Sequence, residues 1–319
     1  MRDFPSIGHI DRFAPEFDSL VGPERNIELL DVGFAWPEGP VWSARESILL
    51  FSDIPRNAIY QWTEATGARI WMQPSGYTGI EYYGKEPGSN GLTFDGEGRL
   101  LACEHGDRRV SRLEPGGGKI TIVDSYEGRR LNSPNDLVVG QRGDLYFTDP
   151  AYGLHHRYED PARELPFCGV YLVRAGRREA ILLTDELENP NGVAFSADGR
   201  FLYVTQSNPR RAIVMSYLLR DDGTLGSGRV LIDLTERAPE APGLPDGIKV
   251  DCQGNIFTTG PGGVWAATPS GRLLGRIAPG RRVANLCWGD DGGTLYLCAD
   301  DYLCRIRTDT RGPLPGAPA

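Results

Sequence analysis

Apolar and polar residues alternate in short runs along this chain, and Gly, Asn and Asp separate the runs. The clearest example is NGVAFSADGRFLYVTQ at 191–206, where a polar residue opens an alternating stretch, a Gly follows eight positions later and a second apolar stretch comes next. Alternation with a period of two is typical of strands, and the Gly marks the turn between them. No stretch shows a convincing amphipathic helix pattern. The pattern therefore predicts an all-β chain of strand-turn-strand units.

The same unit occurs six times, and we call the first residue of each copy position zero. Five copies carry Gly eight residues after position zero, whereas the first copy has Glu46 there. A third apolar run follows each unit, and a fourth often follows it. Six copies of about four strands predict a six-bladed β-propeller. The residues at position zero are Glu38, Asn90, Asn135, Asn191, Asp246 and Asn285.

The two ends of the chain predict how the ring closes. Residues 26–33 read NIELLDVG, a spare strand before the first copy, while the last copy lacks a fourth strand. We expect the spare N-terminal strand to join the last blade, which removes a free sheet edge. The predicted organisation is an N-terminal arm at 1–25, a single propeller domain at 26–312 and a Pro-rich tail at 313–319.

The composition is that of an ordinary soluble protein, with 40% apolar and 24% charged residues and a net charge of -9. The negative charge argues against nucleic acid as a partner, because phosphate binding needs clustered Lys and Arg. No apolar run approaches the roughly 20 residues that span a bilayer, and no secretory signal is evident, so we expect no membrane partner. The six cysteines form no CxxC pair, and we expect buried free thiols in the cytoplasm.

The position-zero residues are candidates for a cation site. In a propeller the first strand of each blade lines the central channel, so these six residues should meet at one mouth. All of them carry a carboxylate or a carboxamide, whose oxygens suit a hard cation such as Ca²⁺ or Mg²⁺ rather than a structural zinc ion. Asn, Asp and Gly also begin strands and form turns, so each position alone has a structural alternative. Glu38 fits that alternative least, because Glu is not a turn former.

Other candidates lie near the same mouth. His105 ends the second hairpin and is either a site residue or a structural histidine. Asp149 and Tyr152 lie in FTDPAYGL, where Asp149 equally fits a cap of the turn before Pro150. Two long insertions, at 72–89 and 150–168, are rich in Tyr, Gly and Pro. Long irregular loops are either lids over a site or surface excursions that only pack, and the sequence leaves both open.

The repeated stretches together resemble the gluconolactonase, regucalcin and senescence-marker family of six-bladed propellers over most of residues 34–310. The bacterial gluconolactonase branch looks closest. The resemblance implies one divalent cation in the channel mouth, Ca²⁺ first, with Mg²⁺, Mn²⁺, Zn²⁺ or Fe²⁺ as alternatives. It also implies hydrolysis of a sugar lactone, a small-molecule partner. We expect a monomer or a homodimer. The matching stretches are WPEGPVW, SNGLTFDGEGRLLACEHGDRRV, LNSPNDLVVGQRGDLYFTDPAYGL, ENPNGVAFSADGRFLYVTQS and LPDGIKVDCQGNIFTTGPGGVW.

The resemblance assigns roles to individual positions. Glu38 matches the Glu of the EGP motif and Asn191 the Asn of the NG motif, both metal ligands in the family. Asp246 matches the Asp of the PDG motif, which is a ligand and the suggested catalytic proton-transfer residue. Asn135 matches the Asn of the ND motif, which contacts the metal or the substrate.

One departure from the family concerns the substrate. Regucalcin-like members have an Arg two residues before Asn135, and this chain has Ser133 there. The substrate must therefore be held differently, with Arg108 and the 72–89 insertion as further candidates. The predicted substrate-binding residues are Asn90, His105, Arg109, Asn135, Asp149 and Tyr152.

Two other functions remain open on the same ring of residues. A phosphotriesterase-like hydrolase would differ in its substrate and not in its metal site. A non-catalytic calcium-binding or ligand-binding propeller would be stabilised by the cation without hydrolysing a lactone.

Overall fold

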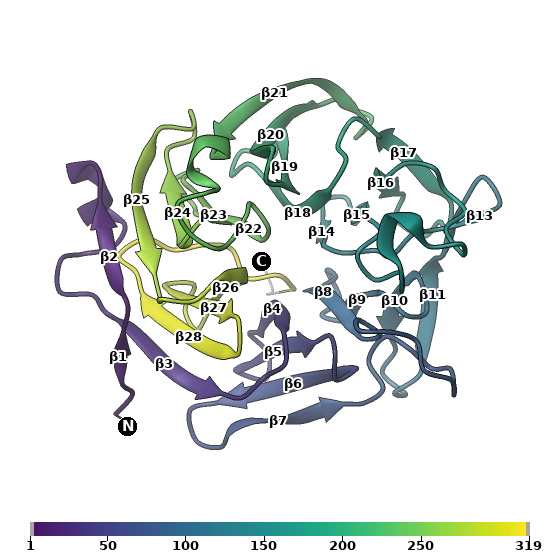
Figure 1. Cartoon of the computed structure of the whole chain (residues 1–319), viewed down its shortest axis with the longest axis horizontal. Coiled ribbons are helices and arrows are strands. Elements are labelled where there is room, and N and C mark those ends of the chain that lie inside the picture. Colours follow the sequence, from purple (N-terminus) through teal and green to yellow (C-terminus); the bar gives the residue numbers. More distant parts are fainter. Residues whose placement is uncertain (1–2, 317–319) are drawn as a thin grey trace.

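The alternating runs form antiparallel sheets, and six such sheets stand as blades around a central axis in the computed structural model, which describes residues 3–316 (Figure 1). The predicted six-bladed propeller is confirmed. The first blade contains β4 (Pro37–Ser43), β5 (Ile48–Asp53), β6 (Ala58–Thr63) and β7 (Gly67–Met72). The second contains β8 (Ser89–Phe94), β9 (Leu100–Glu104), β10 (Arg109–Leu113) and β11 (Lys119–Val123), and the hairpin of β12 (Ser125–Tyr126) and β13 (Arg129–Arg130) follows it.

The next two blades have the same order, with the first strand nearest the axis (Figure 1). Blade three contains β14 (Leu137–Val139), β15 (Leu145–Asp149), β16 (Gly169–Val173) and β17 (Ala180–Thr184). Blade four contains β18 (Pro190–Phe195), β19 (Phe201–Asn208), β20 (Arg211–Leu219) and β21 (Leu225–Asp233). Three short 3-10 turns, η1 (Pro15–Ser19), η2 (Arg157–Glu159) and η3 (Thr235–Arg237), are the helical segments of the described residues. No helix among residues 3–316 is long and apolar enough to cross a membrane.

The last two blades are completed by strands from the N-terminus. Blade five contains β22 (Ile248–Val250), β23 (Ile256–Gly260), β24 (Gly263–Ala267) and β25 (Leu273–Ala278), with β2 (His9–Arg12) at its outer edge. Blade six contains β26 (Val283–Gly289), β27 (Thr294–Ala299) and β28 (Tyr302–Arg307), followed by β3 (Ile27–Val32) and β1 (Ser6–Ile7).

The pairing of β3 with β28 closes the ring. The two strands are antiparallel, with Val32 opposite Tyr302 and Ile27 opposite Ile306. The spare N-terminal strand therefore joins the last blade, as predicted. The predicted arm at 1–25 contributes β1 and β2 as edge strands, so part of it extends the sheets of blades five and six. Residues 317–319 of the predicted tail lie outside the described residues.

Apolar side chains fill the spaces between neighbouring blades. Between blades two and three, for example, Cys103 and Val110 pack with Phe147 and Tyr171, and all four are fully buried. This packing explains the alternation in the sequence, because each blade must bury both faces against its neighbours. All six cysteines are free thiols and five are buried, but Cys252 is exposed, so the prediction of buried thiols was wrong at that position.

The two long insertions lie against each other. Tyr82 of the first insertion makes an edge-on ring contact with His155 of the second, with ring centroids 6.1 Å apart. Glu86 and Arg157 form an ion pair across the same junction at 3.6 Å. The insertions therefore form a joint structure beside blades one to three, and both cavities described below use it.

Candidate active site

The position-zero residues all lie at the same end of the innermost strands. In four blades the pairing between the first and second strands is irregular at this point, next to Glu38, Asn90, Asn191 and Asn285. In the other two blades the position-zero residue comes just before the inner strand starts. A bulge redirects a side chain out of the regular alternation of a strand. At these positions the side chains are therefore released from the regular alternation of a paired strand.

A closed circle of hydrogen bonds joins each blade to the next at this level. Each bond runs from one blade to the position-zero region of its neighbour, and the last returns to blade one. Its members are Ser52 Oγ to Asn90 O (2.8 Å), Gly91 N to Asn135 O (2.8 Å), Thr148 Oγ1 to Asn191 O (2.7 Å), Thr205 Oγ1 to Asp246 O (2.6 Å), Gly247 N to Ala284 O (2.9 Å) and Asn285 Nδ2 to Glu38 Oε2 (2.9 Å).

The glycine after position zero is required by this circle. A Cβ at Gly39 would lie 2.0 Å from the carbonyl oxygen of Asn90, and one at Gly192 would lie 2.2 Å from that of Asp246. Such separations are far below van der Waals contact, so only Gly fits. The Asn-Gly and Asp-Gly pairs in the sequence therefore reflect close approach of neighbouring blades.

A cavity of about 380 Å³, which we call the channel cavity, opens at this end of the axis. It brings together four of the predicted site residues, namely Asn90, Asn191, Asp246 and Tyr152. Glu38 and Asn135 are buried and do not line it, although Glu38 is close enough to Asp246 for their charges to interact. The other lining residues include Trp36, Glu86, Arg157, Tyr158, Asn189, Ser207 and Arg282.

Three carboxylates concentrate negative charge beside this cavity. Burial raises the pKa of Glu38 to about 7, and the neighbouring charge of Asp136 contributes to the rise. Burial also raises the pKa of Asp246 well above its ordinary value, and the charges of Glu38 and Asp136 add to this. Lys249 acts in the opposite direction on Glu38 and Asp136 without cancelling the rise. The positive charge near the three carboxylates is therefore too small for all of them to be ionised at once without a cost in free energy.

Several oxygens at the site also lack hydrogen-bond donors. The side-chain oxygens of Asn90 and Asn191 are buried and have no hydrogen-bond partner among the described residues. Within the same residues, the Asp246 carboxylate forms no hydrogen bond or ion pair, although its backbone is bonded on both sides. Buried acceptors without donors are costly unless something positive meets them. The amides and carboxylates fit one hard divalent cation, which prefers oxygen ligands.

The fit depends on amide oxygens as well as carboxylates. No cluster of three or more His, Cys, Asp or Glu residues arranged to hold a metal occurs in the part of the chain that the structure describes. Glu38 and Asp246 thus need the Asn oxygens to complete a site. This composition favours a hard cation over one that prefers nitrogen or sulfur ligands.

His105 lies directly behind the channel cavity. Its ring is fully buried, and its Nε2 lies 3.3 Å from the Asn90 amide nitrogen. Burial lowers the pKa of His105 to about 3, so the ring is neutral at neutral pH. A neutral Nε2 that accepts from Asn90 leaves the proton on Nδ1, which lies 3.6 Å from Glu86 Oε2. The contact between the Asn90 amide nitrogen and His105 Nε2 orients the Asn90 oxygen away from His105.

Two of the predicted substrate-binding residues lie elsewhere. Asp149 is fully buried and accepts hydrogen bonds from the backbone amides of Asn132 (2.7 Å) and Ser133 (2.8 Å), so it holds the segment before Pro134 and not the turn before Pro150 considered as its alternative. Arg109 pairs with Glu104 at 2.6 Å and lines a second cavity outside the channel. The structure does not bring either residue to the channel cavity.

Sequence reasoning missed several residues of the cavity wall. Glu86 and Arg157 come from the two insertions, whose composition alone did not indicate which side chains face inward. The hydroxyls of Tyr152 and Tyr158 are buried in the cavity wall, where that of Tyr152 lies near Asn189 and Ser207 and that of Tyr158 lies near Tyr152. Arg282 stacks on Trp36 with 4.3 Å between its guanidinium carbon and the ring centroid. The Tyr content of the second insertion was the available signal.

Comparisons with known proteins show the family and the fold of the chain. The family model described as SMP-30/Gluconolactonase/LRE-like region matches residues 36–300. A gluconolactonase from Zymomonas mobilis is 36% identical over 315 residues, covering 96% of this chain and 88% of that protein. Pentonolactonase XacC from Haloferax volcanii is 27% identical, and the match covers 84% of this chain and 83% of that protein. A solved gluconolactonase structure from Xanthomonas campestris has a TM-score of 0.80 at 27% identity, covering 96% and 95% of the two chains.

Proposed function

The chain belongs to the SMP-30/gluconolactonase/LRE-like family, and from this premise we propose that it hydrolyses a sugar lactone such as gluconolactone with the help of one divalent cation. Relatives named gluconolactonase and pentonolactonase support the reaction class. One observation carries the proposal: acceptors without donors converge on a cavity at the axis, at positions that the repeat makes equivalent.

The residues that would hold the cation are Glu38, Asn191 and Asp246, with Asn135 as the fourth predicted ligand. When bound there, a divalent cation polarises the carbonyl of the lactone. The Asn90 oxygen, which also lacks a partner, is available to a ligand or a substrate hydroxyl. We take Ca²⁺ as the first candidate, because a site built from carboxylate and amide oxygens suits it.

Asp246 is the residue that we propose for proton transfer. Its carboxylate lines the cavity and has no competing hydrogen bond among residues 3–316. Burial raises the pKa of Asp246 in the cation-free protein, but a bound cation would lower it, so the lowered pKa of a cation-bound water would supply much of the driving force for proton transfer. Asp246 takes a proton from the water that attacks the acyl carbon, and it returns this proton to the ring oxygen as the carbon–oxygen bond breaks. The net reaction adds one water and yields the hydroxy acid.

The cavity wall is suited to orient a polyhydroxy ring. Tyr152 and Tyr158 place their hydroxyls in the cavity wall, and Glu86 and Arg157 offer a paired acceptor and donor there. The combination of aromatic rings and hydroxyl partners is appropriate for a small neutral sugar derivative. In this proposal these residues hold the substrate, because the chain has Ser133 where regucalcin-like members have an Arg.

The test is an acid-release assay on glucono-lactone with metal-stripped protein and with protein reloaded with Ca²⁺, Mg²⁺, Mn²⁺, Zn²⁺ or Fe²⁺. We expect the stripped protein to lose activity and at least one cation to restore it above the spontaneous rate. Full activity without a cation would contradict the proposed need for a cation. No activity with any of the cations would contradict the proposed hydrolysis of a lactone.

The same experiment separates the alternatives. A phosphotriester hydrolysed faster than every lactone would favour the phosphotriesterase-like function. Thermal stabilisation by a cation without hydrolysis of either substrate would favour a non-catalytic cation-binding propeller. Asp185→Asn, an exposed aspartate away from the cavity, is the control for changes that replace a carboxylate.

A further inference from the structure

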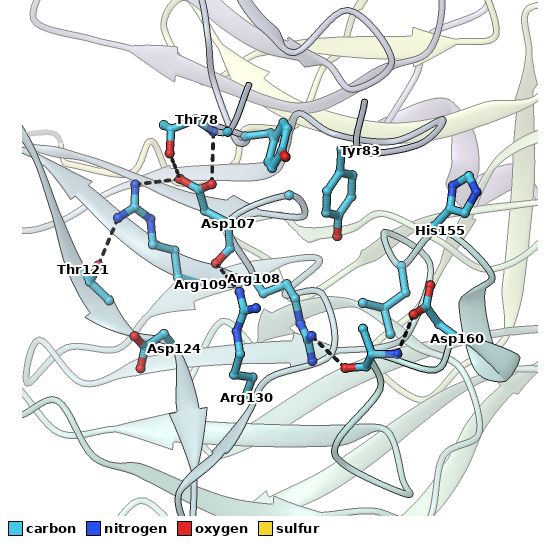
Figure 2. Close-up of a pocket in the computed structure, with 15 residues that line it drawn as sticks. Thr78, Tyr83, Asp107, Arg108, Arg109, Thr121, Asp124, Arg130, His155 and Asp160 are labelled. Carbon is cyan, nitrogen blue, oxygen red and sulfur yellow. Dashed lines mark hydrogen bonds and ion pairs between the residues drawn. The ribbon is translucent and has the colours of Figure 1, made fainter. Parts of the chain in front are cut away.

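A second cavity, of about 660 Å³, lies outside the channel, and we call it the loop cavity (Figure 2). It is an open cavity lined by the two insertions, the turn between β9 and β10, and the β12–β13 hairpin. No residue that we assign to lactone hydrolysis lines it. Its lining residues include Tyr77, Thr78, Tyr83, Asp107, Arg108, Arg109, Thr121, Asp124, Arg130, Leu154, His155, Asp160 and Ala162.

The most unusual group in the loop cavity is the guanidinium of Arg108. The residue is 3% exposed, and its Nε and Nη1 donate to the backbone carbonyls of Leu131 and Ala162 at 2.7 and 2.9 Å. Its Nη2 is buried without a hydrogen-bond partner, and no carboxylate of residues 3–316 lies within ion-pair distance of the group. Burial lowers the pKa of Arg108 and the charge of Arg130 lowers it further, while the more distant charges of Glu164 and Asp149 raise it without cancelling the fall. A buried charge without a counter-ion lowers the stability of the folded protein.

Arg130 presents a second guanidinium to the same space. Its side chain makes one long hydrogen bond, from Nη2 to the Asp107 carbonyl at 3.4 Å, and no carboxylate of the described chain pairs with it. Arg109 differs, because it is paired with Glu104 and with Asp107 at 3.2 Å. The two neighbouring arginines without carboxylate partners are therefore Arg108 and Arg130.

The three carboxylates that line the loop cavity have other partners, and Asp124 accepts from the Ser125 hydroxyl at 3.0 Å. Asp107 accepts hydrogen bonds from the backbone and the hydroxyl of Thr78, at 3.0 and 2.9 Å. Asp160 accepts from the backbone amides of His156 and Ala162, both at 2.8 Å. These bonds fix the insertions in place, and they direct the Asp107 and Asp160 carboxylates to groups other than the two guanidiniums.

An aromatic wall faces the two arginines. The rings of Tyr77 and Tyr83 lie 4.9 Å apart, and Figure 2 shows the Tyr83 hydroxyl pointing toward Arg108 and Arg130. The charges of both arginines act on the Tyr83 hydroxyl, so the three groups are close in space. The loop cavity thus combines unpaired positive charge with flat apolar surface.

We propose that the loop cavity binds a small organic oxyanion whose carboxylate or phosphate group is held by Arg108 and Arg130. A guanidinium presents its donors in a planar fork that matches the oxygens of such groups. The anion supplies the counter-charge that Arg108 lacks, and the tyrosine rings contact the carbon skeleton. This proposal does not depend on lactone hydrolysis, because no residue of the channel cavity takes part.

The test is calorimetric titration of the protein with sodium phosphate, glucose 6-phosphate and sodium gluconate, at an ionic strength held constant with NaCl. Wild type is compared with Arg130→Gln, which removes an exposed charge, and with Arg178→Gln, an exposed arginine of blade three, as the matched control. We expect saturable binding of at least one anion, weakened on the order of tenfold in Arg130→Gln and unchanged in Arg178→Gln. Preference for gluconate or for glucose 6-phosphate identifies a carboxylate or a phosphate as the natural group.

Two further variants decide where the anion binds. Arg108→Lys keeps the positive charge but removes the free Nη2 donor, and it should also weaken binding; if it does not fold, Arg130→Gln alone decides. Arg282→Gln changes the channel cavity instead, lies in neither insertion and should leave binding unchanged. Absence of saturable binding, equal binding in wild type and Arg130→Gln, or loss only in Arg282→Gln would each overturn the proposal, whatever the lactone assay shows.

Discussion

The channel cavity and the loop cavity each have a residue in contact with His105, Asn90 and Tyr83 respectively, and their unpartnered buried groups have opposite character. In the channel cavity the groups without partners are oxygens of Asn90 and Asn191, beside carboxylates with raised pKa values. In the loop cavity the group without a partner is a guanidinium nitrogen of Arg108. Because burial penalises a polar group without a partner, such groups indicate the charge of the ligand that each site takes.

The two cavities also differ in origin. The channel oxygens stand at equivalent positions of the repeat, so the blade circle of hydrogen bonds places them rigidly. The loop cavity is built from the two insertions, the β12–β13 hairpin and the turn between β9 and β10. Repetition therefore created the ring of similar side chains, while the two guanidiniums of the loop cavity come from one turn of the second blade and the hairpin that follows it.

The largest effect should follow from Asp246→Asn, which removes the proposed base from the channel cavity. We expect lactone hydrolysis to fall by about a thousandfold, since general base groups contribute on the order of 10²–10⁴ in rate. Stability should not fall, because the variant removes a buried charge that lacks a counter-charge. Initial rates and urea denaturation measure the two quantities.

Asp149→Asn is the contrasting variant for that measurement. Asp149 accepts two backbone hydrogen bonds outside the cavity, so this change should lower stability by about 1–3 kcal/mol and leave the rate per folded molecule intact. Wild-type turnover in Asp246→Asn would remove that residue from the mechanism.

The next effect concerns the cation. If the channel cavity binds Ca²⁺, a concentration of 100 times Kd should stabilise the protein by about 2.7 kcal/mol. Glu38→Gln should abolish this gain at the same concentration, because it removes one of two carboxylate ligands. Arg130→Gln should retain it, because the loop cavity is separate. Denaturation with and without Ca²⁺ checks all three proteins, and an equal gain in Glu38→Gln would contradict the assigned ligand.

Acidification should distinguish His105 from the carboxylates. Its folded pKa of about 3 lies below its ordinary value of 6.5, so between these values the unfolded chain binds a proton that the folded protein does not. Stability is therefore lost as pH falls from 6.5 toward 3, by up to about 1.4 kcal/mol per pH unit from this group. Glu38 has the opposite sign, because its folded pKa of about 7 exceeds its ordinary value of 4.5. In the cation-free protein Glu38 adds stability as pH falls from about 7 toward 4.5.

The difference between wild type and His105→Gln isolates the histidine contribution. Urea denaturation of both proteins at pH 6.5 and 5.5 with a chelator should show a smaller loss on acidification in the variant. Equal losses would mean that His105 is charged in the folded protein.

The repeat allowed much of this molecule to be predicted, for a physical reason. Six copies of one unit revealed the blades, the closing strand and the level at which Glu38, Asn191 and Asp246 meet. The same reading missed that Gly39 and Gly192 serve close blade packing, because a turn and a close contact favour the same residue. It could not place side chains from the insertions, whose conformation depends on contacts between the two of them and on no period.

Arg109 shows the limit most clearly. The sequence suggested that Arg109 lies at the channel mouth. In the structure Arg109 pairs with Glu104 and lines the loop cavity. The unpaired arginine is Arg108, which lies in the turn with a positive φ of 55°. A turn residue with positive φ breaks the alternation on which strand reasoning depends. Which of two adjacent arginines is buried therefore had to come from the structure.

The smallest effect tests the bond that joins the two cavities. The Tyr83 hydroxyl donates to the His105 carbonyl at 3.1 Å, so it links the aromatic wall of the loop cavity to the residue behind Asn90. Tyr83→Phe should cost about 1 kcal/mol, the usual worth of one hydrogen bond, whereas Tyr82→Phe, which changes an exposed ring, should cost nothing measurable. Urea denaturation measures both. Because the His105 ring is held by Asn90 and its own burial, KM for the lactone should stay the same in Tyr83→Phe; a raised KM would show that the loop cavity supports the channel site through this bond and that the two are one functional unit.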